Sequence, residues 1–404
     1  MAINLQSVIA AIEAKAAAAD STTPISDLYK IIIEANEVGI PMGVYDSAGV
    51  MPIDSAYVGS VFSTSAGGLY VLDSAGGSWQ TADGTPPPPP PIDAMLQGTS
   101  YGYVAGGYFQ PSSPSSTDVI QKYSYTSNGN SVSVGTINKK WFNNKGATSV
   151  LAGYVIGGDG DPTGGADGAL DKFPFAVGTS SGLILDLSNV GRPKNQVISS
   201  NIGAFIPGTG PSGVSPLNTE NLVRFAFEND TQTEVAGVLG SSSVSLGLAG
   251  GSSSSTHGYL TGGRHMPANS YITAIRRFPF ATSTTTEVMG AVMVNNAAQG
   301  YATQSTTHGY QFGGSSPAIF NSNVIQKFNY SSDTNAVNIG SMAIGVMAQS
   351  TSASTTKAYS AGGMDASNAV NYNIIQSVPF ATDTNSTDVG DLLTVNRAAS
   401  GHQN

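Results

Sequence analysis

Few residues in this sequence have the types and spacing that catalysis or metal binding requires. Cysteine is absent, which excludes disulfides, thiolate metal sites and cysteine nucleophiles. The sequence contains no zinc-hydrolase spacing, phosphate-binding loop, dinucleotide fingerprint or strained nucleophile turn. Two loop carboxylates could still converge for glycoside cleavage, although no pattern indicates such a pair. We therefore predict no catalytic residue, no cofactor and no metal ligand.

One loop has the oxygen spacing of half a calcium site. Asp159, Asp161 and Asp167 are spaced like the first ligands of a calcium-binding loop. Leu170 stands where the bidentate glutamate of such a loop should be. An ordinary polar turn is therefore favoured, and calcium binding is the alternative for this loop.

The histidines indicate a repeat rather than a site. His257 and His308 each precede a Gly-Tyr pair, in the segments HGYLTGG and HGYQFGG. The segments YGYVAGG, AGYVIGG, GAFIPGT and KAYSAGG have the same pattern. The last glycine, or the glycine aligned with it, recurs at intervals of 51, 50, 55, 51 and 49 residues. We interpret His257 and His308 as repeat-packing residues, whereas the period does not explain His265.

Two further markers follow each of these segments. An aromatic residue recurs at Tyr125, Phe175, Phe227, Phe280, Tyr330 and Phe380. Ten residues later a glycine recurs in five of the six repeats, and Leu185 replaces it in the second. Alternating apolar residues between Ser, Thr, Asn, Asp and Gly turns indicate about four strands per repeat. A four-stranded sheet of about 50 residues has the size of one propeller blade.

These markers resemble kelch-type β-propellers, although the tryptophan that kelch repeats normally carry is missing. The resemblance implies a mainly β fold: a six-bladed kelch-like β-propeller over residues 98–404, preceded by a small α+β N-terminal anchoring module. Aromatic pairs such as Phe278 and Phe280 are expected to fill the space between blades. We expect the recurring glycines where strands approach a crowded axis or form a bulge.

The C-terminus is expected to close the propeller, because unpaired sheet edges invite aggregation. Residues 396–404 read as an innermost strand that has no blade after it. We predict that they complete the first blade. Their alignment with residues 295–303 places His402 at the position of Tyr301.

The N-terminal quarter has a different composition. Residues 1–97 hold ten acidic and two basic residues, whereas residues 98–404 hold sixteen and fourteen. Apolar positions at helical spacing predict a helical anchoring segment over residues 1–38. Alternating residues with Ala-Gly-Gly turns predict a small β module over residues 39–85. Six consecutive prolines make residues 86–97 a stiff spacer.

The segment VGSVFSTSAGGLYVLDSAGGSW, residues 58–79, resembles a β motif of bacteriophage tail-fibre and other virion structural proteins. With the Gly, Ser, Thr and Asn-rich repeat, the whole chain resembles a virion protein of a marine or cyanobacterial phage. The resemblance implies a non-enzymatic protein, made in the host cytoplasm without a signal peptide, whose residues 1–85 dock to other virion proteins. It also implies host attachment through a surface glycan or protein. Homo-oligomers are common among such fibres.

Loops between the second and third strands of each repeat differ from one another, whereas loops between the third and fourth are nearly uniform. Aromatic and polar side chains on loops of a rigid scaffold suit contact with a sugar or a protein. The candidate ligand-binding residues are Tyr108, Phe109, Arg264, His265, Phe320 and Tyr372. Alternatively, these side chains fold back on their own loops.

Two other functions stay open. The propeller could be a structural or decorative part of a capsid or tail without receptor binding, or an enzyme that acts on surface polysaccharide. Nucleic-acid binding is not expected, because the formal charge is −10. Membrane insertion is not expected either, because no stretch approaches the roughly 18 apolar residues of a membrane span.

Overall fold

The computed structural model of the chain describes most of the repeat region. The described ranges are 97–109, 116–158, 167–178, 182–186, 195–200, 203–209, 221–227, 230–238, 246–265, 270–281, 287–292, 298–316, 322–365 and 370–404, together with four short strands before them. The chain divides into two compact units, Met1–Pro91 and Ile92–Asn404. The described residues are mainly β-strand and contain no helix. The expected helical segment and proline spacer lie outside them.

The first unit contains one small sheet. Its strands are β1 (Val44–Tyr45), β2 (Val61–Thr64), β3 (Leu69–Leu72) and β4 (Trp79–Thr81), which pair in that order. β1 and β2 are parallel, and the other two pairs are antiparallel. The Ala-Gly-Gly sequences of the predicted β module lie outside the described residues.

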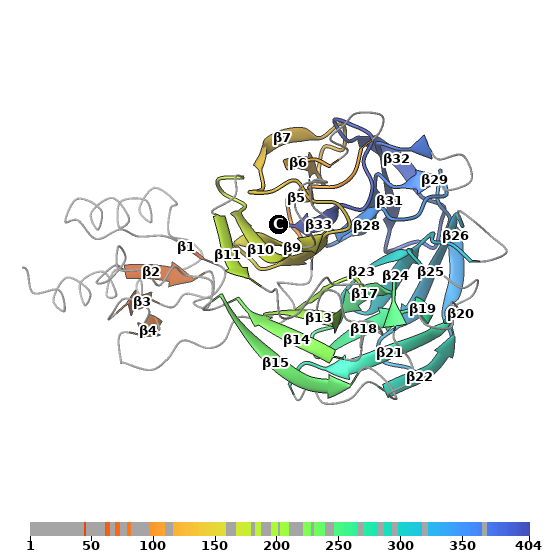
Figure 1. Ribbon diagram of the computed structural model, residues 1–404, viewed down its shortest axis with the longest axis horizontal. Helices are drawn as coiled ribbons and strands as arrows, with labels where there is room; N and C mark the ends of the chain where they lie inside the picture. Colours follow the sequence, from red (N-terminus) through yellow and green to blue (C-terminus); the bar gives the residue numbers. More distant parts are fainter. Residues whose placement is uncertain are drawn as a thin grey trace, which may run out of the picture. The chain divides into compact units, whose positions relative to one another are not determined.

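The second unit contains six four-stranded antiparallel sheets, which we number 1 to 6 (Figure 1). The strands of each sheet are named in their order of pairing, from the first strand to the fourth. Sheet 1 holds β33 (Ser400–Gln403), β5 (Tyr101–Ala105), β6 (Val119–Ser124) and β7 (Val132–Thr136). Sheet 2 holds β8 (Lys145–Thr148), β9 (Ala152–Gly158), β10 (Asp167–Pro174) and β11 (Gly182–Asp186), and sheet 3 holds β12 (Ile198–Ser199), β13 (Gly203–Thr209), β14 (Asn221–Ala226) and β15 (Thr231–Val238). Sheet 4 holds β17 (Gly250–Ser253), β18 (His257–Thr261), β21 (Ala274–Pro279) and β22 (Glu287–Val292); sheet 5 holds β23 (Tyr301–Gln304), β24 (His308–Phe312), β25 (Val324–Asn329) and β26 (Val337–Ser341); sheet 6 holds β27 (Ser350–Ala353), β28 (Lys357–Ala361), β31 (Ile374–Pro379) and β32 (Thr387–Asp391).

Short extra strands occur in two of the loops that join second and third strands, and one further short strand, before the first strand of sheet 4, pairs with one of these strands. β16 (Leu246–Gly247), β19 (Arg264–His265) and β20 (Ser270–Tyr271) form a three-stranded sheet beside sheet 4. β29 (Met364–Asp365) pairs with β30 (Val370–Asn371) beside sheet 6.

The C-terminal strand pairs with the first strand of the repeat region, as predicted. β33 runs antiparallel to β5, with Ser400 opposite Ala105 and His402 opposite Tyr103. The alignment of His402 with Tyr301 is wrong by two residues, however. Ala398 and Gln299 both have left-handed backbones two residues before their strands begin, so His402 corresponds to Thr303.

The first strands of the six sheets lie side by side. β33 contacts β8, β8 contacts β12, and the series continues through β17, β23 and β27 before it returns to β33. In Figure 1, β33, β17 and β23 lie toward the middle of this unit, whereas β7, β15 and β22 lie at its rim. We call these six strands the first-strand ring, and the line that they surround the axis.

The residues before the first strands mark one end of the axis. Gln299 N donates to Leu248 O, Ala348 N to Gln299 O, and Ala398 N to Ala348 O, at 2.7–3.0 Å. All four residues have positive φ angles between 53° and 63°. Because neighbouring first strands begin beside this series of hydrogen bonds, we call this the near end and the opposite one the far end.

Aromatic side chains join each sheet to the next. An aromatic residue on each second strand packs against one or two aromatic residues at the end of the third strand in the following sheet. The shortest ring separation, 4.4–4.9 Å, is always to the residue immediately after that strand. The shortest pairs are Tyr103–Phe175, Tyr154–Phe227, Phe205–Phe280, Tyr259–Tyr330, Tyr310–Phe380 and Tyr359–Tyr125. The last pair joins sheet 6 to sheet 1. The expected packing between sheets is confirmed, with a second-strand aromatic as the partner that the sequence did not identify.

The glycines Gly135, Gly340 and Gly390 lie at the expected β-bulges, because the pairing with the third strand shifts in register beside each of them. Other glycines serve purposes that were not expected. In sheet 2 a side chain at Gly153 would lie 2.3 Å from the ring of Phe173, so this glycine makes room for the aromatic residue opposite it. Gly362 and Gly363 have φ angles of +66° and +106° at the start of a second-to-third loop. They allow a left-handed turn there, which other residues adopt only with strain. Crowding at the axis therefore does not explain these pairs.

Candidate functional site

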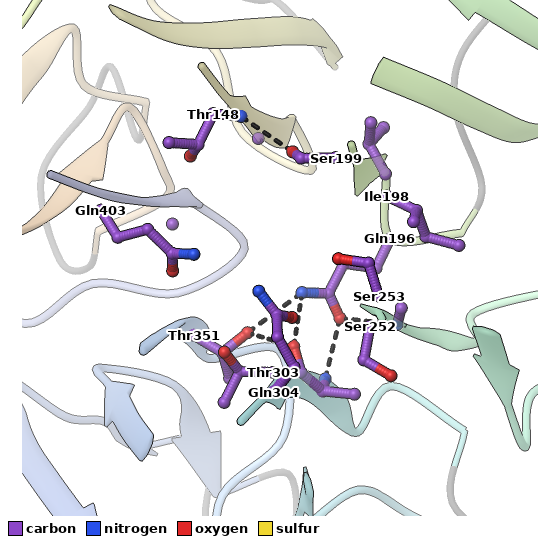
Figure 2. Close-up of a pocket in the computed structure, with 15 residues that line it drawn as sticks. Thr148, Gln196, Ile198, Ser199, Ser252, Ser253, Thr303, Gln304, Thr351 and Gln403 are labelled. Atoms are coloured by element: carbon purple, nitrogen blue, oxygen red, sulfur yellow. Dashed lines mark hydrogen bonds between the residues drawn. The ribbon is translucent and has the colours of Figure 1, made fainter. Parts of the chain in front are cut away.

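The first-strand ring contains a polar pocket, which we call the axial pocket. It holds about 380 Å³ of space, part of which is open to solvent. All six sheets contribute to its wall (Figure 2). Its polar side chains are Thr148, Gln196, Ser199, Ser252, Ser253, Thr303, Gln304, Thr351 and Gln403. None of the described residues that line it is ionisable, so the pocket offers neutral hydrogen-bonding groups and no acid or base.

Gln196 is the centre of the hydrogen bonding in this pocket. The residue precedes β12, and its Oε1 accepts hydrogen bonds from Gly251 N at 2.9 Å and Ala302 N at 2.8 Å. Its Nε2 donates to Ala302 O at 2.8 Å and to Thr351 Oγ1 at 3.0 Å. These backbone groups lie on first strands, whose inner edges have no neighbouring strand to pair with. Gln196 therefore satisfies open sheet edges and links sheet 3 to sheets 4, 5 and 6.

Other lining side chains satisfy the same kind of edge near the far end. Ser199 Oγ accepts a hydrogen bond from Thr148 N at 2.9 Å. Gln403 Oε1 accepts one from Ala353 N, also at 2.9 Å. Figure 2 shows Thr148 and Ser199 facing each other across neighbouring strands. The polar lining is thus partly engaged in holding the ring together.

A charged contact spans the axis at the near end. Lys145 begins β8 in sheet 2, and Tyr301 begins β23 in sheet 5. Lys145 Nζ donates to the Tyr301 hydroxyl at 2.7 Å and lies 5.0 Å from the centre of the tyrosine ring. Both residues are buried. Because sheets 2 and 5 are three steps apart in either direction around the ring, this hydrogen bond crosses the axis.

His402 holds the C-terminal strand against sheet 2. Its imidazole is buried, contacts Ala147 O at 2.9 Å through Nδ1, and contacts Ser400 Oγ at 2.9 Å through Nε2. The ring also packs edge-on against Phe173 at 4.9 Å. Burial lowers the pKa of His402 to about 4, although the hydrogen bond to the carbonyl acts in the opposite direction. The side chain is therefore neutral at pH 7 and has a structural role.

His257 and His308 make matching contacts in their own repeats. The Nδ1 atom of each lies 2.8 Å from the hydroxyl of the threonine before it, Thr256 or Thr307. Burial, together with the charge of Lys327, lowers the pKa of His308. The repeated geometry agrees with the interpretation of these histidines as repeat-packing residues.

The predicted ligand-binding residue Tyr108 is held by contacts within the second unit. Its backbone forms two hydrogen bonds with Arg397, at 2.8 and 3.1 Å. The Arg397 guanidinium lies 4.5 Å from the ring centre of Tyr108, and Phe142 packs edge-on against the same ring at 5.3 Å. The Tyr108 ring therefore packs against residues outside its own loop, and ligand binding by this residue stays a prediction.

Arg264 and Tyr372 also make local contacts. Arg264 lies 5.9 Å from the ring centre of Tyr271 in the neighbouring short strand. Tyr372 packs against the apolar core between sheets 5 and 6. Phe109 is half-buried, and His265 lies in β19. Phe320 lies outside the described residues, and so do residues 159–166, most of the loop for which a polar turn was favoured and calcium binding was the alternative.

The residues that cross the axis were not identified from the sequence. Lys145, Gln196 and Tyr301 occupy equivalent repeat positions, at which sheets 4, 6 and 1 have Gly250, Ser350 and Ser400. These three side chains are large, whereas the equivalent side chains in the other sheets are small. A position-by-position comparison of the repeats would reveal this difference. It becomes visible only after the left-handed residues have fixed the register.

No family model matches the chain, and no curated protein matches it. Among the described residues, no group of three or more histidine, aspartate or glutamate side chains could hold a metal ion. The described part of the chain also contains no helix long and apolar enough to cross a membrane.

Proposed function

We propose that this chain is a non-enzymatic bacteriophage virion structural protein, a tail fibre or an appendage. In this proposal residues 98–404 form a six-bladed kelch-like β-propeller closed by the C-terminal strand. Residues 1–85 dock to other virion proteins, and the propeller contacts a glycan or protein on the host surface. The resemblance of residues 58–79 to virion β motifs supports the assignment to a phage particle.

Three features support the proposed propeller. The β33–β5 pairing joins the two ends of the second unit in one sheet. The first strands contact one another in cyclic order. The interface between sheets 6 and 1 repeats the aromatic packing of the other five, and Tyr123 OH lies 2.7 Å from Ser352 Oγ across it.

The position of the loops is the observation that carries the proposed display role. The first described residues of the second unit lie at the far end, where Gly98 N donates to Ala353 O and Thr99 N donates to Asn404 O. Each second strand then runs toward the near end, so the described residues that flank the loops between second and third strands lie there. A tether at one end and distinctive loops at the other suit a protein that is attached on one side and binds on the other. The uncharged axial pocket favours binding over catalysis.

Electron microscopy of the particle tests the display role. An antibody fragment against residues 98–404 should label the virion at a site that projects away from its body. A label flush with the capsid or tail wall would support a decorative component instead, and no label on the particle would contradict the assignment to a virion.

An adsorption assay tests the near-end loops. Purified full-length protein should compete with phage for host cells, and the double variant F109A/F320A should compete less well. The matched control changes two exposed far-end residues, as T306A/T355A, and should compete like the wild type. Equal competition by both variants would remove the near end from host recognition. Release of reducing sugar from host polysaccharide would establish the enzymatic alternative.

A further inference from the structure

Lys145 is a buried cation without a negatively charged partner among the described residues. Its exposed fraction is 6%, and lysine is rarely buried to this extent unless it is paired. The ion pairs in the described part of the chain include Lys172–Asp230, Arg277–Asp333 and Lys327–Asp383, all more exposed. The most buried of these lysines is therefore the one that lacks a carboxylate.

The hydrogen bonding of Lys145 is also incomplete. A lysine ammonium has three N–H donors, and the Lys145 side chain makes one hydrogen bond, to the Tyr301 hydroxyl. The tyrosine ring adds a favourable contact with the positive charge at 5.0 Å. Burial of an ammonium with two unused donors is unfavourable, and one hydrogen bond to a phenol does not offset it. The site requires a further acceptor.

Tyr301 supplies a third donor to the same place. Its hydroxyl oxygen accepts the hydrogen bond from Lys145, so its own O–H proton is available to an acceptor. The side chain of Tyr301 packs with Ala348 and Ala398, two of the left-handed residues at the near end. The Gln196 side chain lies farther along the axis and makes four hydrogen bonds to neighbouring first strands. The acceptor that fits is small, because side chains from opposite sheets meet here.

We propose that Lys145 and Tyr301 bind a small anion on the axis, at the near end of the first-strand ring. Two ammonium N–H groups and the phenol O–H donate to it, and the lysine charge balances its negative charge. Chloride and a carboxylate group as small as formate share the required chemistry. The bound anion links sheet 2 to sheet 5, and this site is independent of the proposed role in a virion.

Thermal unfolding at constant ionic strength tests the site. Full-length protein is kept in a bulky organic sulfonate salt, which is then replaced stepwise by chloride or by formate. The wild-type Tm should rise by roughly 3 to 6 °C and saturate, as expected when a ligand binds only the folded state. If the Tm rises to saturation with only one of the two anions, that anion is the one that occupies the site.

The Lys145→Met variant should lose this dependence on the anion. The matched control is Lys122→Met, because Lys122 also lies over a tyrosine ring, 4.4 Å from the centre of Tyr101, on a different strand. The control should keep the full Tm shift. Equal shifts in both variants and in the wild type would overturn the proposal, because they would reflect a general salt effect.

A crystal of the wild-type protein soaked in bromide gives a result that does not depend on whether a variant folds. The anomalous signal should show one peak beside Lys145 Nζ and the Tyr301 hydroxyl. A water molecule or an empty site there, with bromide only on the surface, would overturn the proposal. Tyr301→Phe, which removes one donor, should raise the half-saturating anion concentration severalfold. The anion should still raise the Tm of this variant.

Discussion

The interfaces between sheets and the axis of the same ring are built in opposite ways. Six times around the ring, a second-strand aromatic packs against the third strand of the next sheet, with nearly the same spacing. At the axis, by contrast, equivalent positions hold a lysine, a glutamine, a tyrosine, a glycine and two serines. Repetition supplies the stability of the fold, and departures from it create the individual chemistry at the centre.

Removal of the C-terminal strand should have the largest effect on this regular shell. Deletion of residues 398–404 leaves β5 with an open edge and removes His402 from its contact with sheet 2. We expect the cooperative thermal transition to be lost, with aggregation through the exposed edges. Circular dichroism melting and size-exclusion chromatography measure both. Gln403→Ala, which removes one side-chain hydrogen bond, is the control, and a deletion variant that melts like it would contradict closure by the tail.

Loss of one aromatic residue at the junction of sheets 6 and 1 should have the next largest effect on stability. Tyr359→Ala empties the space beside Tyr123 and Tyr125, and we expect unfolding free energy to fall by about 3 to 5 kcal/mol. Denaturant unfolding measures the change. Tyr101→Ala is the comparison, because that side chain is 37% exposed and should cost about 1 kcal/mol or less. Similar losses for the two variants would show that this junction is not packed.

Acid should weaken the contact between the tail strand and sheet 2. The folded-state pKa of His402 is about 4, below the ordinary value of 6.5, because burial favours the neutral ring. The stabilisation is therefore complete above pH 6.5 and is lost as pH falls toward 4. Between pH 7 and pH 5 the loss should be about 2 kcal/mol. His402→Thr, which copies Thr303 of sheet 5, should flatten this dependence, whereas His257→Gln should not.

A glycine opposite an aromatic residue offers a test of packing within one sheet. Gly309→Ala places a methyl group 2.3 Å from the Phe328 ring, and we expect a loss of about 1 to 2 kcal/mol. Phe328→Val should make the alanine better tolerated, because sheet 6 pairs Ala358 with Val378 at these positions. A double-mutant cycle measures the coupling. Strictly additive losses would contradict this complementarity.

The ion pairs between neighbouring sheets should have the smallest effect. Lys327 lies 2.6 Å from Asp383, but half of the aspartate side chain is exposed. Solvent screens such pairs, so Lys327→Met should change stability by about 0.2 to 1 kcal/mol. Denaturant unfolding at low and high salt measures it. A larger loss that persists at high salt would show that the pair is better shielded than its exposure indicates.

The difference between shell and axis also explains how far the sequence could be interpreted. The recurring glycines and aromatics of segments such as HGYQFGG predicted the sheets, and the unfinished repeat at residues 396–404 predicted the partner of β5. The register of His402 was wrong because a left-handed Ala398 carries no sequence signal. Tyr108 was interpreted as exposed because its partners, Arg397 and Phe142, are distant in sequence and meet it only in the folded chain.

The axis was beyond prediction for a related reason. Lys145 lies in one repeat and Tyr301 three repeats later, so no local pattern joins them. Gln196 likewise reaches Ala302 and Thr351 across the ring. Contacts between opposite sheets depend on the number of sheets and on their order around the axis. A sequence pattern within one repeat contains neither.

Hydrogen exchange of the C-terminal strand tests the central claim most directly. If the tail completes sheet 1 and closes a six-bladed propeller, the amides of residues 400–403 exchange as slowly as those of β27, and both exchange only when the whole unit unfolds. Exchange of residues 400–403 within the dead time of the experiment, with β27 still protected, would show a free tail and would contradict the account.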